Sequence, residues 1–244
     1  MNLLFVLDPL ETLKIEKDTS YVMMREAQSR GHQIWVTTQH DIQNVSGKVI
    51  VRAQHLILTE TPNTWYEVVT SQDISASNID GVVMRKDPPF DMEYIYTTYL
   101  LESLEQEGCL VFNRPQSIRD FNEKLSITKY PQFISPTLVA ADVSVINDFI
   151  AEQNEVVLKP LDGMGGSSVF RSRSQDPNLG VIIETLTQLG QRTIMVQKFI
   201  PDISDGDKRV LLIDGEPAPY TLARIPQGVD HRGNLAVGGR GVAM

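Results

Sequence analysis

A strand-like run that ends in a lysine and opens into glycines carries the clearest chemistry in this sequence. Residues 156–173 read VVLKPLDGMGGSSVFRSR, so Lys159 closes an apolar run and the glycine segment Gly163–Gly166 follows it. Glycines let backbone N–H groups close around anionic oxygens, and a neighbouring lysine supplies the balancing charge. The alternating segment Ser167–Arg171 then resumes an extended pattern. The spacing therefore predicts a hairpin loop that folds over a polyphosphate.

Two better-known phosphate loops do not match this segment. A Walker loop needs Gly-Lys-Ser/Thr at the start of a helix, and a dinucleotide fingerprint needs a glycine where Ser168 stands. The glycines here lie between two predicted strands instead. Two alternatives stay open, namely a hairpin that serves only as a turn and a Lys159 side chain that reaches bulk solvent.

Further basic residues could complete an anion site. Lys124 begins a predicted short helix, and Arg85 and Lys86 end the strand GVVMR, at the carboxyl end where open α/β sheets bind ligands. Arginines recur towards the C-terminus, where their planar groups could pair with carboxylates or phosphates and a glycine-rich lid could exclude water. The alternative for Arg85 and Lys86 is a proline-rigid turn with a solvated charge pair, and the alternative for the arginines is a scattered, solvated set. These arginines are Arg209, Arg224, Arg232 and Arg240.

Metal and nucleophile patterns are weak. Asp205 and Asp207 lie in the run Asp-Gly-Asp-Lys-Arg, which predicts a solvated turn rather than a metal site. The single cysteine, Cys109, excludes an intrachain disulfide, and its apolar surroundings predict a buried core residue, with a thiol nucleophile as the alternative. No paired metal-ligand spacing connects the histidines, which are His32, His40, His55 and His231.

The bulk composition excludes several classes of protein. A chain of 244 residues with 41% hydrophobic and 22% charged residues is typical of a globular protein with more than one domain. The formal net charge of −9 argues against a general binder of nucleic acid or anionic membranes. No segment reaches the apolar length that spans a bilayer, and the N-terminus lacks a secretory signal. We therefore expect a cytoplasmic protein without a nucleic-acid or membrane partner.

The first half of the sequence alternates strands and helices, which predicts an open α/β domain with a parallel sheet. Asp18 and Asp91 are positioned to cap helices, and Ser46-Gly47 predicts a hairpin turn between short extended runs. The expected strands are Leu3–Leu7, Gln33–Thr38, Gly81–Arg85 and Cys109–Asn113, and the expected helices are Tyr21–Ser29 and the segment from 92 to 107.

The second half predicts antiparallel strand pairs mixed with helices. Asp142 can cap a helix, and Asp214-Gly215 predicts a hairpin. From Ile225 onwards the sequence is rich in glycine and predicts an irregular segment. Beyond the two strands around the glycine loop, the expected elements are helices at 143–150 and Gly180–Leu189 and strands at Thr193–Phe199, Arg209–Ile213 and Ala218–Ala223.

Six motifs together point to one known family. They are MRKDPPFD at Met84–Asp91, NRPQSIRDFNEK at Asn113–Lys124, LKPLDGMGG at Leu158–Gly166, DGDKRVLLIDGEP at Asp205–Pro217, LARIPQG at Leu222–Gly228 and RGNLAVGGRG at Arg232–Gly241. With these motifs the chain resembles bacterial glutathione synthetase, a member of the ATP-grasp superfamily of carboxylate–amine ligases, almost end to end. Many ATP-grasp enzymes share the lysines and the glycine loop, whereas MRKDPPFD and the last two motifs are narrower.

The resemblance implies an α/β fold in two parts. An N-terminal open parallel-sheet domain, the pre-ATP-grasp domain, is expected over residues 1–121. An ATP-grasp α+β region is expected to follow, with its C-terminal part missing. Within it, residues 122–200 would form the subdomain with the glycine-rich loop, and residues 201–244 the incomplete start of the C-terminal subdomain with its lid loop. The resemblance also implies a homo-oligomer such as a tetramer.

The resemblance further implies an ATP-dependent ligase that joins γ-glutamylcysteine and glycine. An acyl phosphate would form first, and the products would be glutathione, ADP and phosphate. The reaction would use Mg²⁺, whose ligands are expected beyond Met244. Two other functions stay open: a truncated, non-catalytic fragment that binds nucleotide or substrate, and another ATP-grasp peptide ligase.

The resemblance assigns roles to particular residues. Arg209, Arg224 and Arg240 are expected to act in catalysis. Arg85 and Arg232 join these three as expected substrate-binding residues. The expected ATP-binding residues are Lys124, Lys159, Gly163, Met164, Gly165, Gly166, Ser167, Ser168, Gln197, Lys198, Phe199, Ile200 and Asp207.

Overall fold

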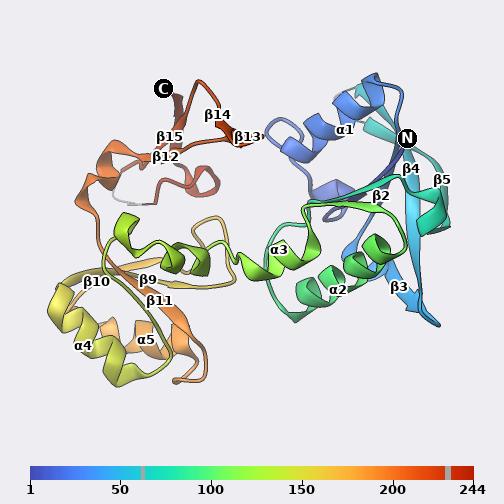
Figure 1. Cartoon of the computed structure of the whole chain (residues 1–244). Helices are drawn as coiled ribbons and strands as arrows, with labels where there is room; N and C mark the ends of the chain where they lie inside the picture. Colours follow the sequence, from blue (N-terminus) through green and yellow to red (C-terminus); the bar gives the residue numbers. More distant parts are fainter. Residues whose placement is uncertain (62–63, 229–231) are drawn as a thin grey trace. The chain divides into compact units, whose positions relative to one another are not determined.

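The structure, a computed structural model, describes residues 1–61, 64–228 and 232–244 (Figure 1). These residues divide into two compact units, Met1–Asn122 and Glu123–Met244. Among the described residues, no helix combines the length and the apolar character that crossing a membrane requires.

The first unit is built on a sheet with the strand order β3-β4-β2-β1-β6-β7, in which β5 also pairs with β4. Strands β2, β1, β6 and β7 are parallel, whereas β3, β4 and β5 are antiparallel. The predicted parallel core is confirmed, but the long β4–β5 hairpin that extends it was not predicted. The strands are β1 Asn2–Val6, β2 Gln33–Thr37, β3 Ile42–Val45, β4 Lys48–Thr61, β5 Thr64–Ser75, β6 Gly81–Met84 and β7 Leu110–Phe112.

Alternation along the central strands gives this sheet two apolar faces. Ile34 on β2 belongs to the same buried cluster as Met24 of helix α1, whereas the next residue, Trp35, joins the cluster that contains Leu101 of helix α2. Because successive strand residues point to opposite faces, one strand can contribute to both cores. The helices of this unit are α1 Thr19–Ser29, α2 Met92–Gln106 and α3 Pro115–Asp120.

Local sequence signals set the ends of these elements. The Asp18 carboxylate accepts a hydrogen bond from the Ser20 amide at 2.6 Å, and Asp91 accepts one from the Tyr94 amide at 3.0 Å. Both carboxylates satisfy N–H groups that the first helical turn leaves without partners. Ser46-Gly47 has positive φ angles at both positions, as a two-residue hairpin turn requires. The predicted caps and this turn are therefore confirmed.

Cys109 is a buried core residue, as its apolar surroundings predicted. Burial raises the pKa of its thiol, and the negative charges of Glu107 and Asp80 raise it further. Both effects oppose a thiolate at neutral pH, so the alternative of a thiol nucleophile is not supported.

The second unit contains an antiparallel sheet with the order β10-β9-β11-β8, covered on one face by helices α4 and α5 (Figure 1). Leu158 of β9 and Val196 of β11 pack in one buried cluster with Ile150 of α4 and Ile183 of α5. The elements are β8 Thr137–Ala140, α4 Val143–Gln153, β9 Glu155–Pro160, β10 Phe170–Arg173, α5 Leu179–Thr187 and β11 Ile194–Lys198.

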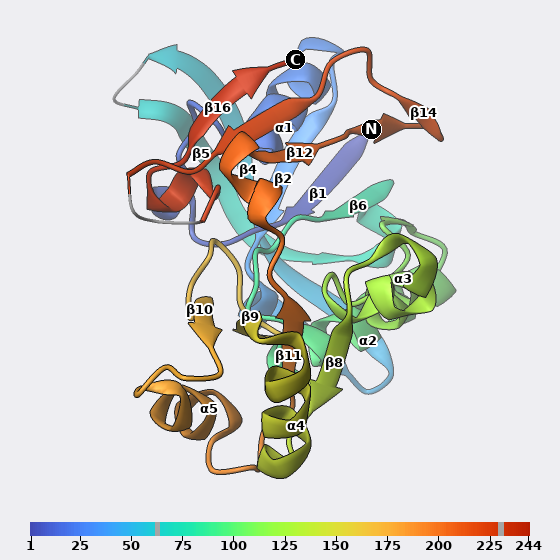
Figure 2. The ribbon, with the colours of Figure 1, turned by 90° about the vertical axis from the view of Figure 1, so that its left-hand side faces the viewer.

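The remaining strands form two smaller sheets, drawn in orange and red in Figure 2. Strand β15 lies between β12 and β16, and β13 pairs with β14 across the predicted Asp214-Gly215 turn. Two expectations are corrected here. The two expected hairpin strands are not continuous, because Arg209–Ile213 is interrupted at residues 210–211 and residues 218–221 of Ala218–Ala223 are not in a strand. The segment expected to be irregular ends in strand β16. The strands are β12 Asp207–Arg209, β13 Leu212–Ile213, β14 Glu216–Pro217, β15 Leu222–Ile225 and β16 Arg240–Ala243.

Short 3₁₀ turns connect the elements of both units. They cover Leu10–Thr12, Gln39–Asp41, Ala76–Asn78, Leu125–Lys129, Pro131–Phe133, Pro201–Asp205 and Leu235–Val237.

Candidate functional site

The face of the β8–β11 sheet opposite its helices carries the polar residues. Val156 and Leu158 of β9 are fully buried beneath α4 and α5, so the alternating positions Val157 and Lys159 point to the other face. Both line an open cavity of about 910 Å³ within the second unit. Of the predicted site residues, the cavity brings together Lys159, Ser168, Gln197, Lys198, Phe199, Ile200, Asp207 and Arg232.

Lys159 does not extend to bulk solvent, so that alternative is wrong. Its ammonium donates a hydrogen bond to the side-chain oxygen of Gln197 at 2.6 Å, and the residue is half-buried. Burial lowers the pKa of the ammonium below its ordinary value of 10.5, and the positive charge of Lys124 lowers it further, with Glu123 acting in the opposite direction. The surroundings of Lys159 therefore disfavour its charged form. An anionic ligand bound beside the ammonium would compensate for this unfavourable energy.

Lys124 lies beside the glycine loop. Its ammonium donates to the backbone oxygen of Gly163 and forms an ion pair with Glu123 at 2.7 Å. At the foot of the loop, Arg192 forms an ion pair with Asp162. These contacts connect the loop to the segment before the turn Leu125–Lys129 and to the segment before β11.

The loop adopts backbone angles that glycine favours. Gly165 and Gly166 have φ angles of +66° and +82°, and Ser168 has a φ angle of +54°. The Ser167 amide closes the turn by donating to the Met164 carbonyl at 3.1 Å. This conformation confirms the predicted hairpin between β9 and β10.

The predicted lid segment packs on this loop. The Arg232 guanidinium donates to the Gly166 carbonyl at 2.9 Å. A Cβ added to Gly166 would lie 2.9 Å from the side-chain oxygen of Asn234, and one added to Gly165 would lie 3.8 Å from Cβ of Ala236. The close approach of the lid therefore depends on the missing side chain at Gly166. Residues 229–231 of the lid, including His231, lie outside the described residues.

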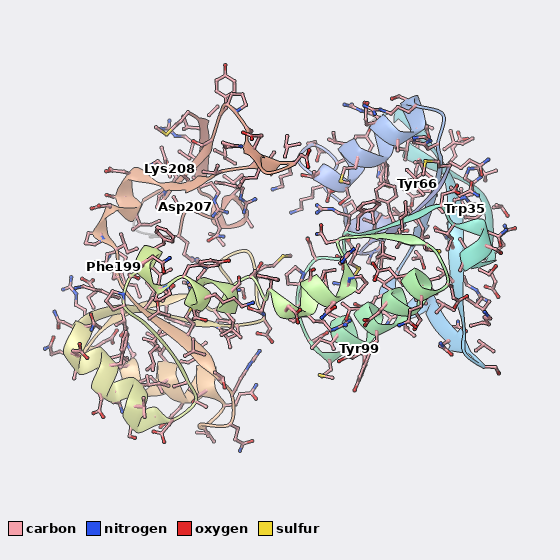
Figure 3. The ribbon with its side chains drawn as sticks, in the orientation of Figure 1. Trp35, Tyr66, Tyr99, Phe199, Asp207 and Lys208 are labelled. Carbon is pink, nitrogen blue, oxygen red and sulfur yellow. The ribbon has the colours of Figure 1, made fainter. Side chains whose placement is uncertain are left out.

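Asp207 is not in a solvated turn, contrary to expectation. It opens β12 directly opposite Arg224 of β15, and the two side chains form an ion pair in which the Arg224 Nε lies 3.1 Å from both carboxylate oxygens. Figure 3 marks Asp207 and Phe199, which both line the cavity. The structure thus joins a residue expected to bind ATP, Asp207, with one expected to bind the substrate, Arg224.

The other predicted arginines are not brought together. Arg209 and Arg240 are exposed, on β12 and β16. The register pairs Arg209 with Leu222 and Arg240 with Ile225, so Arg240 lies on the opposite face of this small sheet from Arg209 and Arg224. Neither exposed arginine lines the cavity.

Arg85 belongs to the first unit, where its Nε donates to the Ser20 hydroxyl at 3.1 Å. The adjacent Lys86 forms an ion pair with Asp8 at 2.8 Å, with the two side chains only 13% and 27% exposed. The alternative of a solvated charge at Lys86 is therefore wrong.

The cavity also contains residues that the sequence did not single out. Arg171 of β10 places its guanidinium carbon 3.8 Å from the centre of the Phe199 ring, and its Nε donates to Glu155 at 2.7 Å. The alternating pattern at 167–171 indicated the strand but gave no sign of this partner 28 positions away. The other cavity residues not predicted are Phe133, Ile134, Ser135, Val157, Val169, Phe170, Ile203, Gly233 and Asn234.

The remaining predicted residues of the loop do not line the cavity. Met164 and Ser167 are exposed, and Gly166 is buried beneath the lid segment.

Within the ranges 1–61, 64–228 and 232–244, no group of three or more His, Cys, Asp or Glu side chains is arranged to hold a metal ion.

Comparison with known proteins assigns both units to one family. Residues 1–119 match the family described as prokaryotic glutathione synthetase, N-terminal domain, and residues 123–244 match prokaryotic glutathione synthetase, ATP-grasp domain. The chain belongs to the prokaryotic glutathione synthetase family. It is 53% identical over 246 residues to the glutathione synthetase of Nitrosomonas europaea, covering 100% of this chain and 77% of that relative. It is 52% identical over 238 residues to that of Vibrio parahaemolyticus, covering 98% of this chain and 75% of that relative.

Solved structures of two synthetases share the fold. D-cycloserine synthetase DcsG aligns with a TM-score of 0.62 at 15% identity, over 91% of this chain and 68% of the other. D-alanyl-alanine synthetase A from Vibrio cholerae aligns with a TM-score of 0.57 at 13% identity, over 93% of this chain and 68% of the other. The expected α/β fold with an ATP-grasp region is confirmed by these similarities and by the family assignment.

Proposed function

We propose that this chain performs ATP-dependent ligation of γ-glutamylcysteine with glycine to give glutathione, ADP and phosphate. Membership of the glutathione synthetase family carries the assignment. The observation in the structure that supports it is the cavity wall formed by Lys159, whose charge is held half-buried beside a glycine loop. A polyphosphate is the ligand that would compensate this charge.

The described residues fit ATP in three ways. Lys159 and Lys124 lie where they could neutralise phosphate oxygens, and the loop Gly163–Ser168 could donate backbone N–H groups to them. The aromatic ring of Phe199, held by Arg171, offers an apolar surface for a purine base. Asp207 lies in the same cavity and could accept from a ribose hydroxyl.

Positioning and charge neutralisation are the main demands of phosphoryl transfer. In the proposed reaction a carboxylate oxygen of the dipeptide attacks the γ-phosphorus of ATP, and ADP leaves. The glycine amine then attacks the acyl carbon, and phosphate leaves. Water would hydrolyse the acyl phosphate, so the contact between Arg232 and Gly166 is proposed to help keep the lid closed during both steps.

The roles of the other arginines and of Mg²⁺ stay proposals. Arg85, Arg209 and Arg240 could pair with substrate carboxylates, and Arg224 could do so if it exchanged its Asp207 partner. The described residues offer no metal-ligand cluster, so we derive no step through Mg²⁺. The prediction that its ligands lie beyond Met244 stays a prediction. The homo-oligomeric assembly is also a prediction, which light scattering can measure. The cytoplasmic location is another, which cell fractionation can measure.

The test is release of phosphate from ATP with each substrate in turn and with both. We expect release only when γ-glutamylcysteine and glycine are both present, with glutathione identified by mass spectrometry. A reaction with two D-alanines as the substrates is the control for another ATP-grasp ligase. Phosphate release that ignores γ-glutamylcysteine would contradict the proposal, and nucleotide binding without any turnover would favour the non-catalytic alternative.

A further inference from the structure

A chain of hydrogen bonds crosses three strands of the β8–β11 sheet and ends at Lys159. The Thr137 hydroxyl of β8 donates to the Ser135 carbonyl at 2.7 Å and lies 2.9 Å from the side-chain nitrogen of Gln197 on β11. The Gln197 side-chain oxygen accepts from the Lys159 ammonium on β9 at 2.6 Å. These contacts lie on the face of the sheet that forms the cavity.

The strand register explains why these side chains meet. Thr137 is directly opposite Gln197 in the β8–β11 pair. Lys159 is opposite Met195 in the β9–β11 pair, and Val157 is opposite Gln197, so Lys159 and Gln197 are diagonal neighbours on one face. Direct and diagonal neighbours of this kind lie within reach of each other's side chains.

The direction of each bond follows from the donors and acceptors available. A threonine hydroxyl can donate only one hydrogen bond, and Thr137 donates it to the Ser135 carbonyl. Towards Gln197 the hydroxyl can therefore act only as an acceptor. The amide must therefore present its NH₂ group to Thr137 and its oxygen to Lys159. The reversed amide would place NH₂ against an ammonium, which has no acceptor.

We propose that Thr137 is a positioning residue for the nucleotide: it fixes the amide orientation of Gln197 and thereby holds the Lys159 ammonium towards the phosphates. This inference rests on the proposed function, because it needs Lys159 to contact ATP. Thr137 is not expected to touch the nucleotide phosphates itself. It acts through Gln197, whose side chain joins β8 to the lysine.

The test measures binding of the non-hydrolysable analogue AMP-PNP with MgCl₂ by titration calorimetry. In Thr137→Val the side chain keeps its shape and its β-branch, but the amide of Gln197 loses the acceptor that orients it. We expect the dissociation constant to rise about tenfold, in the range for one hydrogen bond to a charged group. Thr137→Ser keeps the hydroxyl and should restore binding to within about twofold of the starting protein.

A double-mutant cycle with Gln197→Leu isolates the pathway. Leucine has no amide to orient, so adding Thr137→Val to Gln197→Leu should change affinity by less than about twofold. Urea unfolding of each variant separates lost binding from lost folding. Normal binding by Thr137→Val would overturn the proposal, as would an equal loss in Thr137→Ser or additive effects in the cycle.

Lys159→Met, measured in the same titration, separates this inference from the proposed function. If Lys159→Met binds the analogue normally, the phosphate role of the lysine is wrong and nothing remains for Thr137 to position. If Lys159→Met binds weakly and Thr137→Val binds normally, only the positioning role fails.

Discussion

Replacing Lys159 by methionine should weaken nucleotide binding and stabilise the folded protein at the same time. Methionine keeps the apolar stem of the side chain but removes its charge. The ammonium has three N–H groups, one of which donates to Gln197, and the lysine faces the cavity. One lost hydrogen bond between an ammonium and a phosphate costs roughly 1.5–3 kcal/mol, which raises a dissociation constant about 12- to 140-fold.

The opposite sign is expected for stability because the native environment disfavours this charge. Burial and Lys124 lower the pKa of Lys159 from 10.5 in the folded state. Below that lowered pKa the lysine is protonated in both the folded and the unfolded protein, so the folded state carries the full free-energy cost of the buried charge. Between the lowered pKa and 10.5 the unfolded state binds more protons, so stability rises with pH across this window. The variant has no such ammonium, so it should be more stable than the starting protein at neutral pH and lack this contribution to the pH dependence.

Two measurements check this prediction: AMP-PNP titration in the presence of MgCl₂, and urea unfolding at several pH values. The control is Lys48→Met in the first unit, which removes the same charge from a side chain that is 75% exposed. We expect the control to change neither quantity appreciably. An unchanged nucleotide affinity for Lys159→Met would refute the phosphate role, and a loss of stability would refute the claim that the fold holds this charge at a cost.

Three further predictions concern the cavity wall and its support. Gly166→Ala should lower kcat/KM about tenfold or more, because its Cβ would lie 2.9 Å from the Asn234 side chain. The control is Gly165→Ala, which is also at positive φ but whose Cβ would have its nearest contact at 3.8 Å. This control should lower kcat/KM less. Equal losses in these steady-state assays would show that backbone strain alone matters. Arg171→Met should raise the KM for ATP about three- to tenfold by removing a cation–π contact worth roughly 0.5–2 kcal/mol, and leave the KM for the dipeptide unchanged. Leu158→Ala should destabilise the fold by about 2–5 kcal/mol in urea unfolding, since this side chain is fully buried, and a loss under 1 kcal/mol would contradict the packing described here.

Local patterns were sufficient to predict most of the elements. The caps at Asp18, Asp91 and Asp142 were predicted because a helix start is set by a few neighbouring residues. The turn at Asp214-Gly215 was predicted because it needs only two positive φ angles in succession. Strand β16 was missed because glycine-rich sequence has weak local preference, and its pairing with β15 decides its conformation.

The residues of the site also divide into those that local sequence predicts and those that only tertiary contacts bring together. The sequence alone indicated Lys159 and its glycine loop, because an apolar run, a lysine and glycines within a few positions already constrain the chemistry. Only the tertiary structure decided that Gln197 meets this lysine, that Asp207 pairs with Arg224, and that Arg171 covers Phe199. Each of these contacts joins residues on different strands, so it depends on strand register. Register is set by the burial of whole strand faces across the sheet, so no short segment of the sequence determines it.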